Sequence, residues 1–256
     1  MKRNWLSYMC MAALLSGALT SCNESSFLNL SDPNHFTESN FWKDKADAES
    51  ALAAAYSPIK GAMYGYFGAF DGWLNLNGRG DDIFTIKGEE VPMWNIANFL
   101  NSPSTGNDPY GALYSGIQRA NIVLRYIDQV PASGITEEDR SMIKGEALFL
   151  RGYQYFLLVN NYKEVPLRLI PSNEDETNKG PATEAALWTQ VEEDLGNAIK
   201  CNLPVERTTA KERVTKGAAI AMLGKVYATQ HKYPEAKQLL GTLLKAPYSY
   251  ELVDNF

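Results

Sequence analysis

The chain has 256 residues, with 24 Lys and Arg against 30 Asp and Glu, and a formal net charge of −6. Apolar residues make up 45% and charged residues 21%, which is typical of a globular chain and excludes wholesale disorder. The acidic balance argues against a nucleic-acid partner, and 3 Cys and 2 His are too few for a disulfide framework or a four-thiolate zinc site. The sequence predicts no cofactor and no catalytic centre.

Residues 1–21 predict a lipoprotein signal peptide. Lys2 and Arg3 form a short basic region, and the apolar run that follows is shorter than the roughly 20 residues of a membrane span. The run ends in Leu19-Thr20-Ser21-Cys22, which is similar to a bacterial lipobox. We expect cleavage before Cys22 and lipidation of its thiol, which would anchor the chain to a membrane. A plain secretory signal that happens to contain Cys22 is the alternative.

The next 22 residues, 22–43, are polar and predict a tether and an extended arm, and residues 44–256 predict a helical domain. The first helix begins after Asp44, a suitable N-cap, and continues as apolar residues at helical spacing as far as Met63. Pro58 lies within it and predicts a kink or a new turn, because proline lacks the backbone N–H that a helix interior uses.

Residues 61–108 show no sustained period and predict long loops, with one short helix near 91–100. Glycines alternate here with aromatic and polar residues. A loop of this length in a compact domain usually has a function.

Three helices follow. Asp108-Pro109 opens one whose apolar stripe continues to Ile127, and Thr136 caps the next, which continues toward Leu158. A short extended piece at 165–169 and a polar loop at 171–182 lead to a helix capped by Thr183. Its expected core face is Trp188, Val191, Leu195, Ala198 and Ile199.

The last two helices carry a tetratricopeptide pattern. Leu223-Gly224-x-x-Tyr227 is followed nine residues later by Ala236, and the small residues Gly224 and Ala236 predict two antiparallel helices that cross closely at these positions. One repeat cannot bury its own apolar face, so we expect other helix pairs to stack on it. An ordinary helical hairpin is the alternative. The predicted fold class is mainly α, with tetratricopeptide-like helix pairs in an α-α superhelical scaffold, long loops and little β structure.

The loop region has the residue types that a sugar site needs. Sugars stack their C–H faces on aromatic rings and pair their hydroxyls with polar side chains, without a nucleophile. The ligand-binding residues that we predict are Trp73, Asn75, Arg79, Asp81, Trp94 and Asn95. The alternative for the two tryptophans is that they fill the core. Asp81-Asp82 and Glu89-Glu90 would suit a glycoside hydrolase, but solvated loop charge explains them more simply.

The chain resembles the SusD/RagB family, the surface glycan-binding lipoproteins of Bacteroidetes. The matching motifs span the chain from Cys22 onward. They are Phe27-Leu28-Asn29-Leu30 with Pro33, Phe41-Trp42, Asp47-Ala48-Glu49, Leu113-Tyr114, Ala120-Asn121, Glu146-Ala147 with Phe149-Leu150-Arg151, Tyr153 with Tyr155-Phe156, Val165-Pro166-Leu167, Glu193-Asp194-Leu195, Val214-Thr215-Lys216 and Tyr248 with Tyr250.

The resemblance implies a protein on the outer face of the outer membrane. It would capture an oligosaccharide, or a peptide as some relatives do, and pass it to a TonB-dependent, SusC-like transporter. Helices would form the scaffold and the partner surface, and loops would hold the sugar. The alternative is a tetratricopeptide-type envelope adaptor that binds peptide or protein.

Three departures from the family accompany the resemblance. Family members are roughly twice this length, which predicts a helical domain that is incomplete at its C-terminal end. Lys163 replaces the usual Gly before Val165-Pro166-Leu167, which predicts a turn without a left-handed residue. Gly152 stands where Ala is usual, at an expected cost of about 0.5–1 kcal/mol in helix propensity.

Overall fold

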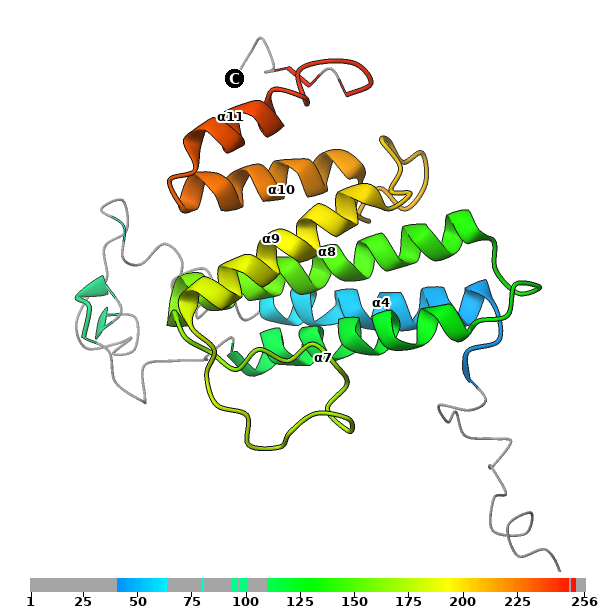
Figure 1. Cartoon of the computed structure of the whole chain (residues 1–256), viewed down its shortest axis with the longest axis horizontal. Helices are drawn as coiled ribbons and strands as arrows, with labels where there is room; N and C mark the ends of the chain where they lie inside the picture. Colours follow the sequence, from blue (N-terminus) through cyan, green and yellow to red (C-terminus); the bar gives the residue numbers. More distant parts are fainter. Residues whose placement is uncertain are drawn as a thin grey trace, which may run out of the picture. The chain divides into compact units, whose positions relative to one another are not determined.

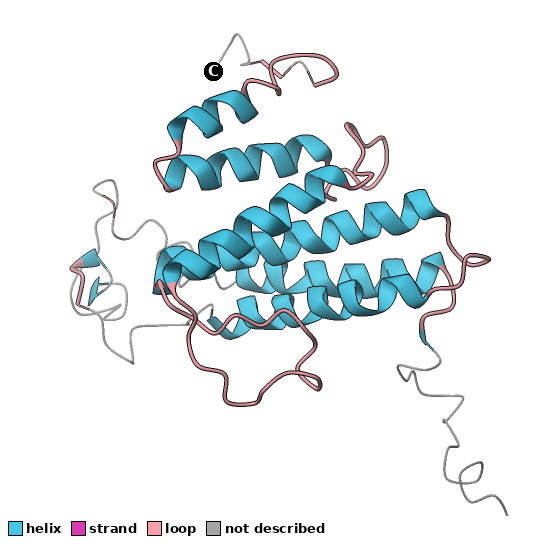
Figure 2. Ribbon diagram, in the orientation of Figure 1, coloured by secondary structure: helices cyan, strands magenta, loops and turns pink. Residues whose placement is uncertain are grey.

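The structure is a computed structural model that describes residues 41–63, 80, 94–95, 97–100, 110–248 and 250–251. Within these ranges all regular structure is helical and no strand occurs (Figure 2). The elements, labelled as in Figure 1, are α4 (Lys45–Met63), α7 (Tyr110–Tyr126), the 3₁₀ helix η2 (Ile127–Gln129), α8 (Glu137–Tyr162), α9 (Glu184–Lys200), α10 (Lys216–Thr229) and α11 (Tyr233–Leu240). The predicted mainly-α fold is confirmed.

Helix α8 is the central element of the stack. It packs against α4 and α7 on one side and against α9 on the other, and α9 in turn packs against α10 (Figure 1). A short turn connects α10 to α11, so the two lie against each other as an antiparallel pair. Each helix therefore buries its apolar face against a sequence neighbour, as stacked helix pairs do.

Three of the predicted helix starts are confirmed by their side-chain caps, whereas Asp108 and Pro109 lie outside the described residues. Asp44 Oδ1 accepts the Asp47 N–H at 3.1 Å, and Thr136 Oγ1 accepts the Asp139 N–H at 3.1 Å. Thr183 Oγ1 accepts the Ala186 N–H at 3.3 Å. Each cap satisfies a backbone donor that the first turn of a helix leaves unpaired.

Pro58 does not end α4, which continues through it to Met63. Proline has no N–H to donate to the carbonyl four residues earlier, which belongs to Ala54. Arg119 Nη1 of α7 donates to this Ala54 oxygen at 2.9 Å. The packing of α7 on α4 thus supplies the hydrogen bond that the helix itself cannot make.

The apolar stripes of four helices form one buried cluster. Its members include Leu113 and Ile117 of α7, Tyr155 and Leu158 of α8, Leu187, Val191 and Leu195 of α9, and Leu223 and Val226 of α10. The stripes expected in α7 and α9 are buried, except that Leu124, Trp188 and Ile199 are only partly so. Burial of this kind stabilises the fold by about 25 cal/mol per Å² of apolar surface.

Two ion-pair networks are buried between the helices. The Arg151 guanidinium of α8 binds the Asp194 carboxylate of α9 through two hydrogen bonds of 2.7 and 2.8 Å, and the side chains are only 10% and 2% exposed. The fully buried Glu146 accepts hydrogen bonds from Arg207 at 2.6 Å and from Arg213 at 2.9 Å. Each network satisfies its charges internally, which a buried charge requires.

The tetratricopeptide pair is present, with α10 packed against α11. A Cβ atom added to Gly224 would lie 2.4 to 3.1 Å from three side-chain atoms of Leu240, so this glycine leaves room for a close neighbour on α11. Ala236, the predicted partner of Gly224, is buried one turn earlier in α11. The predicted crossing of Gly224 with Ala236 itself stays a prediction.

The expectation of a turn without a left-handed residue at Lys163 was wrong, and Gly152 has a packing role beside its expected cost in helix propensity. Lys163 adopts a φ of 64° and a ψ of −77°, and the Glu164 N–H donates to the Tyr162 carbonyl at 2.8 Å across it. The turn therefore keeps a positive φ without glycine. A Cβ on Gly152 would lie 3.1 Å from Asp194 Cβ and from Leu195 Cγ, so this glycine allows α8 and α9 to approach closely.

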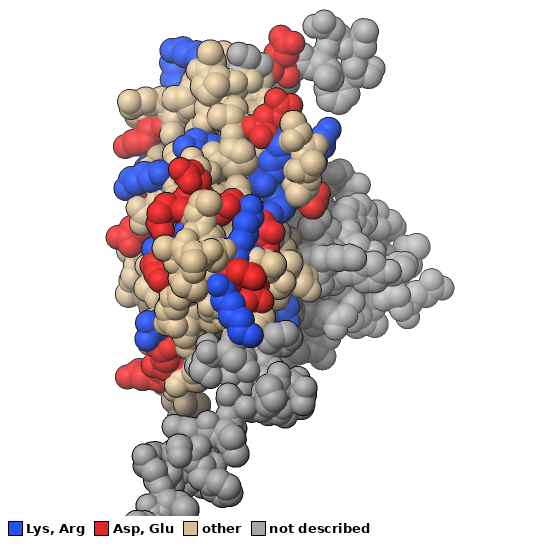
Figure 3. Space-filling view, turned by 90° about the vertical axis from the view of Figure 1, so that its right-hand side faces the viewer, with Lys and Arg blue, Asp and Glu red and all other residues tan. Residues whose placement is uncertain are grey.

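Basic and acidic side chains interleave on the face in Figure 3. Ion pairs with N–O distances of 2.9 Å join Lys45 to Asp139 and Lys144 to Asp128. This face therefore does not concentrate charge of one sign.

Candidate functional site

Two of the predicted ligand-binding residues lie in the described part of the chain. Trp94 and Asn95 are half-buried and helical, as is residue 97, within the range where a short helix was predicted. The Trp94 carbonyl accepts two hydrogen bonds from Asn98, one from the backbone N–H at 3.0 Å and one from the side-chain amide at 2.7 Å. The remaining predicted residues, Trp73, Asn75, Arg79, Asp81 and the lipidation residue Cys22, lie outside the described residues, so their roles stay predictions.

A hollow of about 760 Å³ lies between α9 and the turn that joins α10 to α11. This volume is in the range of small-molecule sites. Its walls are mixed, with one large aromatic ring, a hydroxyl, three carboxylates, an amide and an ammonium group. The lining residues are Glu184, Ala185, Trp188, Thr189, Glu192, Glu193, Gln230 and Lys232.

Trp188 is the aromatic wall of this hollow. It packs against the main apolar cluster, as predicted, but it is only partly buried and also faces the hollow. Its ring packs edge-on against Phe156, with centroids 6.0 Å apart. Its indole N–H donates to Glu184 Oε1 at 3.2 Å, one turn earlier in α9. Two contacts therefore hold the indole in one orientation at the wall.

The Glu184 carboxylate is held in its ionised form. Lys163 Nζ donates to Glu184 Oε1 at 3.0 Å, and this bond, followed by that from the Trp188 indole, keeps the pKa of Glu184 below its usual range. A carboxylate accepts hydrogen bonds only, so this wall favours donors such as hydroxyl groups.

The wall that faces α9 is held by Glu192, which itself lies on α9. Its Oε1 accepts a hydrogen bond of 2.7 Å from Gln230 Nε2 and another from Lys232 Nζ. Both donors come from the turn after α10, so this carboxylate joins α9 to the α10–α11 turn. Among the described residues both bonds end on the same oxygen, which leaves the acceptor positions of Oε2 for a ligand.

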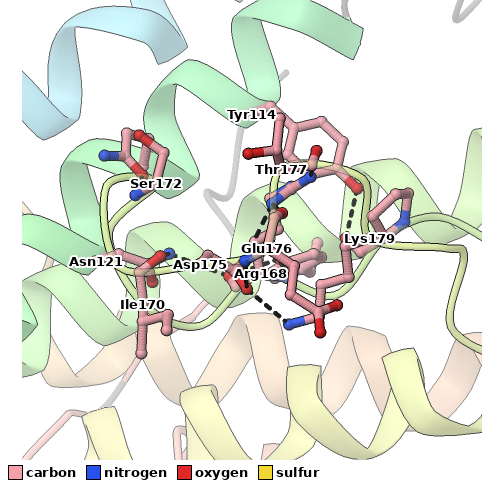
Figure 4. A network of polar contacts seen from close by, with 12 residues as sticks. Tyr114, Asn121, Arg168, Ile170, Ser172, Asp175, Glu176, Thr177 and Lys179 are labelled. Carbon is pink, nitrogen blue, oxygen red and sulfur yellow. Dashed lines mark hydrogen bonds and ion pairs between the residues drawn. The ribbon is translucent and has the colours of Figure 1, made fainter.

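The loop that precedes α9 is pinned by a polar network (Figure 4). Arg168 lies at its centre and donates to the carbonyls of Glu176 at 2.7 Å and Thr177 at 3.1 Å, and to Asp175 at 3.3 Å. Lys179 donates to the other oxygen of Asp175 at 3.2 Å. The loop therefore folds around one arginine.

Side chains of α7 and α8 fasten this loop to the helices. Asn121 donates to the carbonyls of Arg168 and Ile170, each at 3.1 Å, while its own oxygen accepts from Arg151 at 2.9 Å. The Tyr155 hydroxyl accepts the Arg168 N–H at 2.7 Å. Because the loop ends at Thr183, this fastening places the first turns of α9, and with them the wall of the hollow, on a rigid support.

Sequence reasoning missed the hollow, although one pattern was available. Glu184, Trp188 and Glu192 are spaced four residues apart, so they share one face of α9. An indole between two carboxylates on one helical face is unusual for a core position. Gln230 and Lys232 could not be connected to it, because their approach depends on the packing of α10 on α9.

Two negative findings concern the described residues only. They contain no group of three His, Cys, Asp or Glu side chains arranged to hold a metal ion. No helix in the same part of the chain combines the length and apolar character that a membrane crossing needs.

Comparison with known proteins gives a consistent set of matches. Residues 82–228 match the model of the SusD-like family described as "Starch-binding associating with outer membrane". The SusD-like protein P38 of Formosa agariphila is 25% identical over 93% of this chain and 45% of its own length.

The fold is shared with solved structures. A SusD superfamily protein from Bacteroides vulgatus superposes with a TM-score of 0.73 at 30% identity, covering 84% of this chain and 46% of its own. A laminarin-binding SusD-like protein gives a TM-score of 0.73 at 31% identity, with 84% and 47% covered. The chain spans about half the length of these relatives.

Proposed function

Since the chain belongs to the SusD-like family of starch-binding, outer-membrane-associated proteins, we propose that it captures an oligosaccharide at the outer membrane. The family match over 82–228 carries this proposal, and the 31% identity to a laminarin-binding relative supports it. The family is one of carbohydrate-binding, non-catalytic proteins. The ligand would be passed to a TonB-dependent, SusC-like transporter in the same membrane.

The loop aromatics form the primary site in this proposal. Trp73 and Trp94 provide stacking surfaces, and Asn75, Arg79, Asp81 and Asn95 pair with sugar hydroxyls. Trp94 is half-buried, so part of this residue remains accessible. Loops that are carried by a rigid scaffold are where binding residues concentrate.

The test is affinity electrophoresis of the chain through gels that contain laminarin or starch, followed by calorimetric titration of the polysaccharide that retards it. Trp94→Ala should weaken binding several-fold, or by about 1–3 kcal/mol if sugar stacking resembles base stacking. Tyr233→Ala is the matched control, because Tyr233 is an aromatic residue of α11 that is 60% exposed. If neither polysaccharide retards the chain, glycan binding is contradicted. If Trp94→Ala binds as the parent does, Trp94 is a core residue and not part of the binding site.

The anchor is a separate part of the proposal. Leu19-Thr20-Ser21-Cys22 supports lipidation of Cys22, and the anchored domain would face the cell exterior. Labelled palmitate should enter the parent chain and not Cys22→Ala. Label retained by the variant would contradict the anchor, whatever the glycan result.

One observation favours the alternative function of an adaptor for peptide or protein. An apolar groove of about 770 Å³ follows the outer side of α10 and α11. Leu244 and Tyr250, which are 70% and 51% exposed, contribute to its lining. Exposed apolar surface of this kind marks interaction sites. The electrophoresis above separates the two functions, since an adaptor would not be retarded by polysaccharide.

A further inference from the structure

We propose that the hollow between α9 and the α10–α11 turn is a second saccharide subsite, which binds part of a neutral oligosaccharide against Trp188. The subsite is distinct from the loop residues predicted above. It rests on the proposed glycan function, because that function supplies the class of ligand.

The residue types are those that recognise a sugar ring. Trp188 offers an aromatic surface for C–H groups, and Thr189 offers a hydroxyl that can donate or accept. Glu192 and the exposed Glu193 offer acceptors for sugar hydroxyls, while Gln230 and Lys232 offer donors. A site with a few polar groups beside an apolar surface fixes the orientation of a ligand.

The net charge of the side chains around the hollow favours a neutral ligand over a cation. Three carboxylates line the hollow, but Glu184 is paired with Lys163 at 3.0 Å and Glu192 with Lys232. Of these three carboxylates, Glu193 alone forms no ion pair within the described part of the chain. The local charge is therefore nearly balanced. A nearly balanced wall attracts neither a cation nor an anion strongly, whereas hydroxyl groups can still pair with its oxygens.

The subsite is built before the ligand arrives. Phe156 and Glu184 hold the Trp188 ring, and the Glu192 bonds to Gln230 and Lys232 hold the opposite wall. The pinned 165–182 loop supports the start of α9. Preorganisation of this kind improves affinity, because few side chains must be ordered on binding.

The experiment uses laminarihexaose and maltohexaose as probes, with the chain labelled with 5-fluorotryptophan. Trp5 lies in the predicted signal peptide, so the chain from Cys22 onward gives four fluorine resonances, from Trp42, Trp73, Trp94 and Trp188, each assigned by its Phe variant. We expect the Trp188 resonance to move saturably with one probe, while that of Trp42, which is 8% exposed, stays in place. Calorimetry should show Trp188→Ala binding that probe at least 3-fold more weakly than the parent.

Glu192→Gln is the second variant, because it keeps the shape of the wall and removes its charge. It should weaken binding at least 2-fold with its circular dichroism spectrum unchanged, whereas Tyr233→Ala should bind as the parent does. If the probe binds and shifts the resonances of other tryptophans but not that of Trp188, the subsite proposal is contradicted and the proposed function is retained. If neither probe binds, the proposed function fails and the subsite fails with it.

Discussion

The contact between α8 and α9 and the contact between α10 and α11 are built from different chemistry. Buried charges join α8 to α9, since the Arg151 guanidinium binds the Asp194 carboxylate, and Gln190 Nε2 donates to the same carboxylate at 3.0 Å. The α10–α11 pair is joined instead by apolar side chains, with Leu240 lying over Gly224 beside an open groove. The first contact needs specific partners, whereas the second has room to adjust.

The difference explains which residues each region requires. A buried charge that loses its partner cannot be solvated, so α8 and α9 depend on both Arg151 and Asp194. Leu240 is half-buried and lines the groove, so its side chain can turn into open space when a neighbour grows. Three sets of substitutions test this comparison, in order of decreasing expected effect.

Removing one member of the buried pair should have the largest effect. Asp194→Ala leaves the Arg151 guanidinium, 10% exposed, without its bidentate partner. We expect a loss of about 3–5 kcal/mol in the free energy of unfolding, measured by denaturant titration. The double variant Arg151→Met with Asp194→Leu should recover most of this loss. A single-variant loss below about 1 kcal/mol would contradict the role assigned to the pair.

Adding a methyl group at Gly152, in the α8–α9 contact, and at Gly224, in the α10–α11 contact, compares the two contacts directly. Gly152→Ala places a Cβ 3.1 Å from Asp194 Cβ, which the ion pair holds in place, so we expect a loss of about 1–2 kcal/mol despite better helix propensity. Gly224→Ala places a Cβ 2.4 Å from Leu240 Cδ2 and 2.5 Å from its Cγ, so Leu240 must turn into the open groove. Because that side chain is free to move, we expect a change of less than about 0.5 kcal/mol. Thermal unfolding of both variants compares them, and the reverse order would overturn the distinction.

The smallest effect should come from the turn residues, where the two regions are alike. Lys163 after α8 and His231 after α10 have positive φ values of 64° and 61°, which glycine adopts at lower cost. Lys163→Gly and His231→Gly should each stabilise the fold by about 1 kcal/mol. Calorimetric melting measures the gain, with Gly180→Ala, whose added methyl would meet no atom within 4 Å, as a neutral control. Destabilisation by either glycine would mean that the side chain contributes more than the backbone strain costs.

The His231 turn has a definite geometry that accounts for its positive φ. The Lys232 N–H donates to the Tyr227 carbonyl at 2.9 Å, and the His231 N–H donates to the Ala228 carbonyl at 3.1 Å. This pair of bonds is the Schellman motif, in which the residue after the C-cap is left-handed and usually glycine. Neither this turn nor that at Lys163 contains glycine, so composition alone did not mark them.

The sequence predicted those features that depend only on neighbours along the chain, namely helix caps and apolar stripes. The caps at Asp44, Thr136 and Thr183 and the stripes of α7 and α9 follow from spacing within one helix, and the structure confirms them. The motifs of the resemblance also included Glu146 and Arg151. Their ionic partners, Arg207 and Arg213 for Glu146 and Asp194 for Arg151, come from other segments of the chain and could not be assigned from spacing along it.

The sequence by itself determined where the helices begin, which faces are apolar and to which family the chain belongs. Only the tertiary structure decided what each helix meets. It placed Leu240 beside Gly224, gave Gly152 a role in close packing, and brought Gln230 and Lys232 to Glu192 at the Trp188 hollow. The physical reason is that helix periodicity is a local property, whereas a crossing point or a cavity depends on side-chain volumes from segments far apart in the chain.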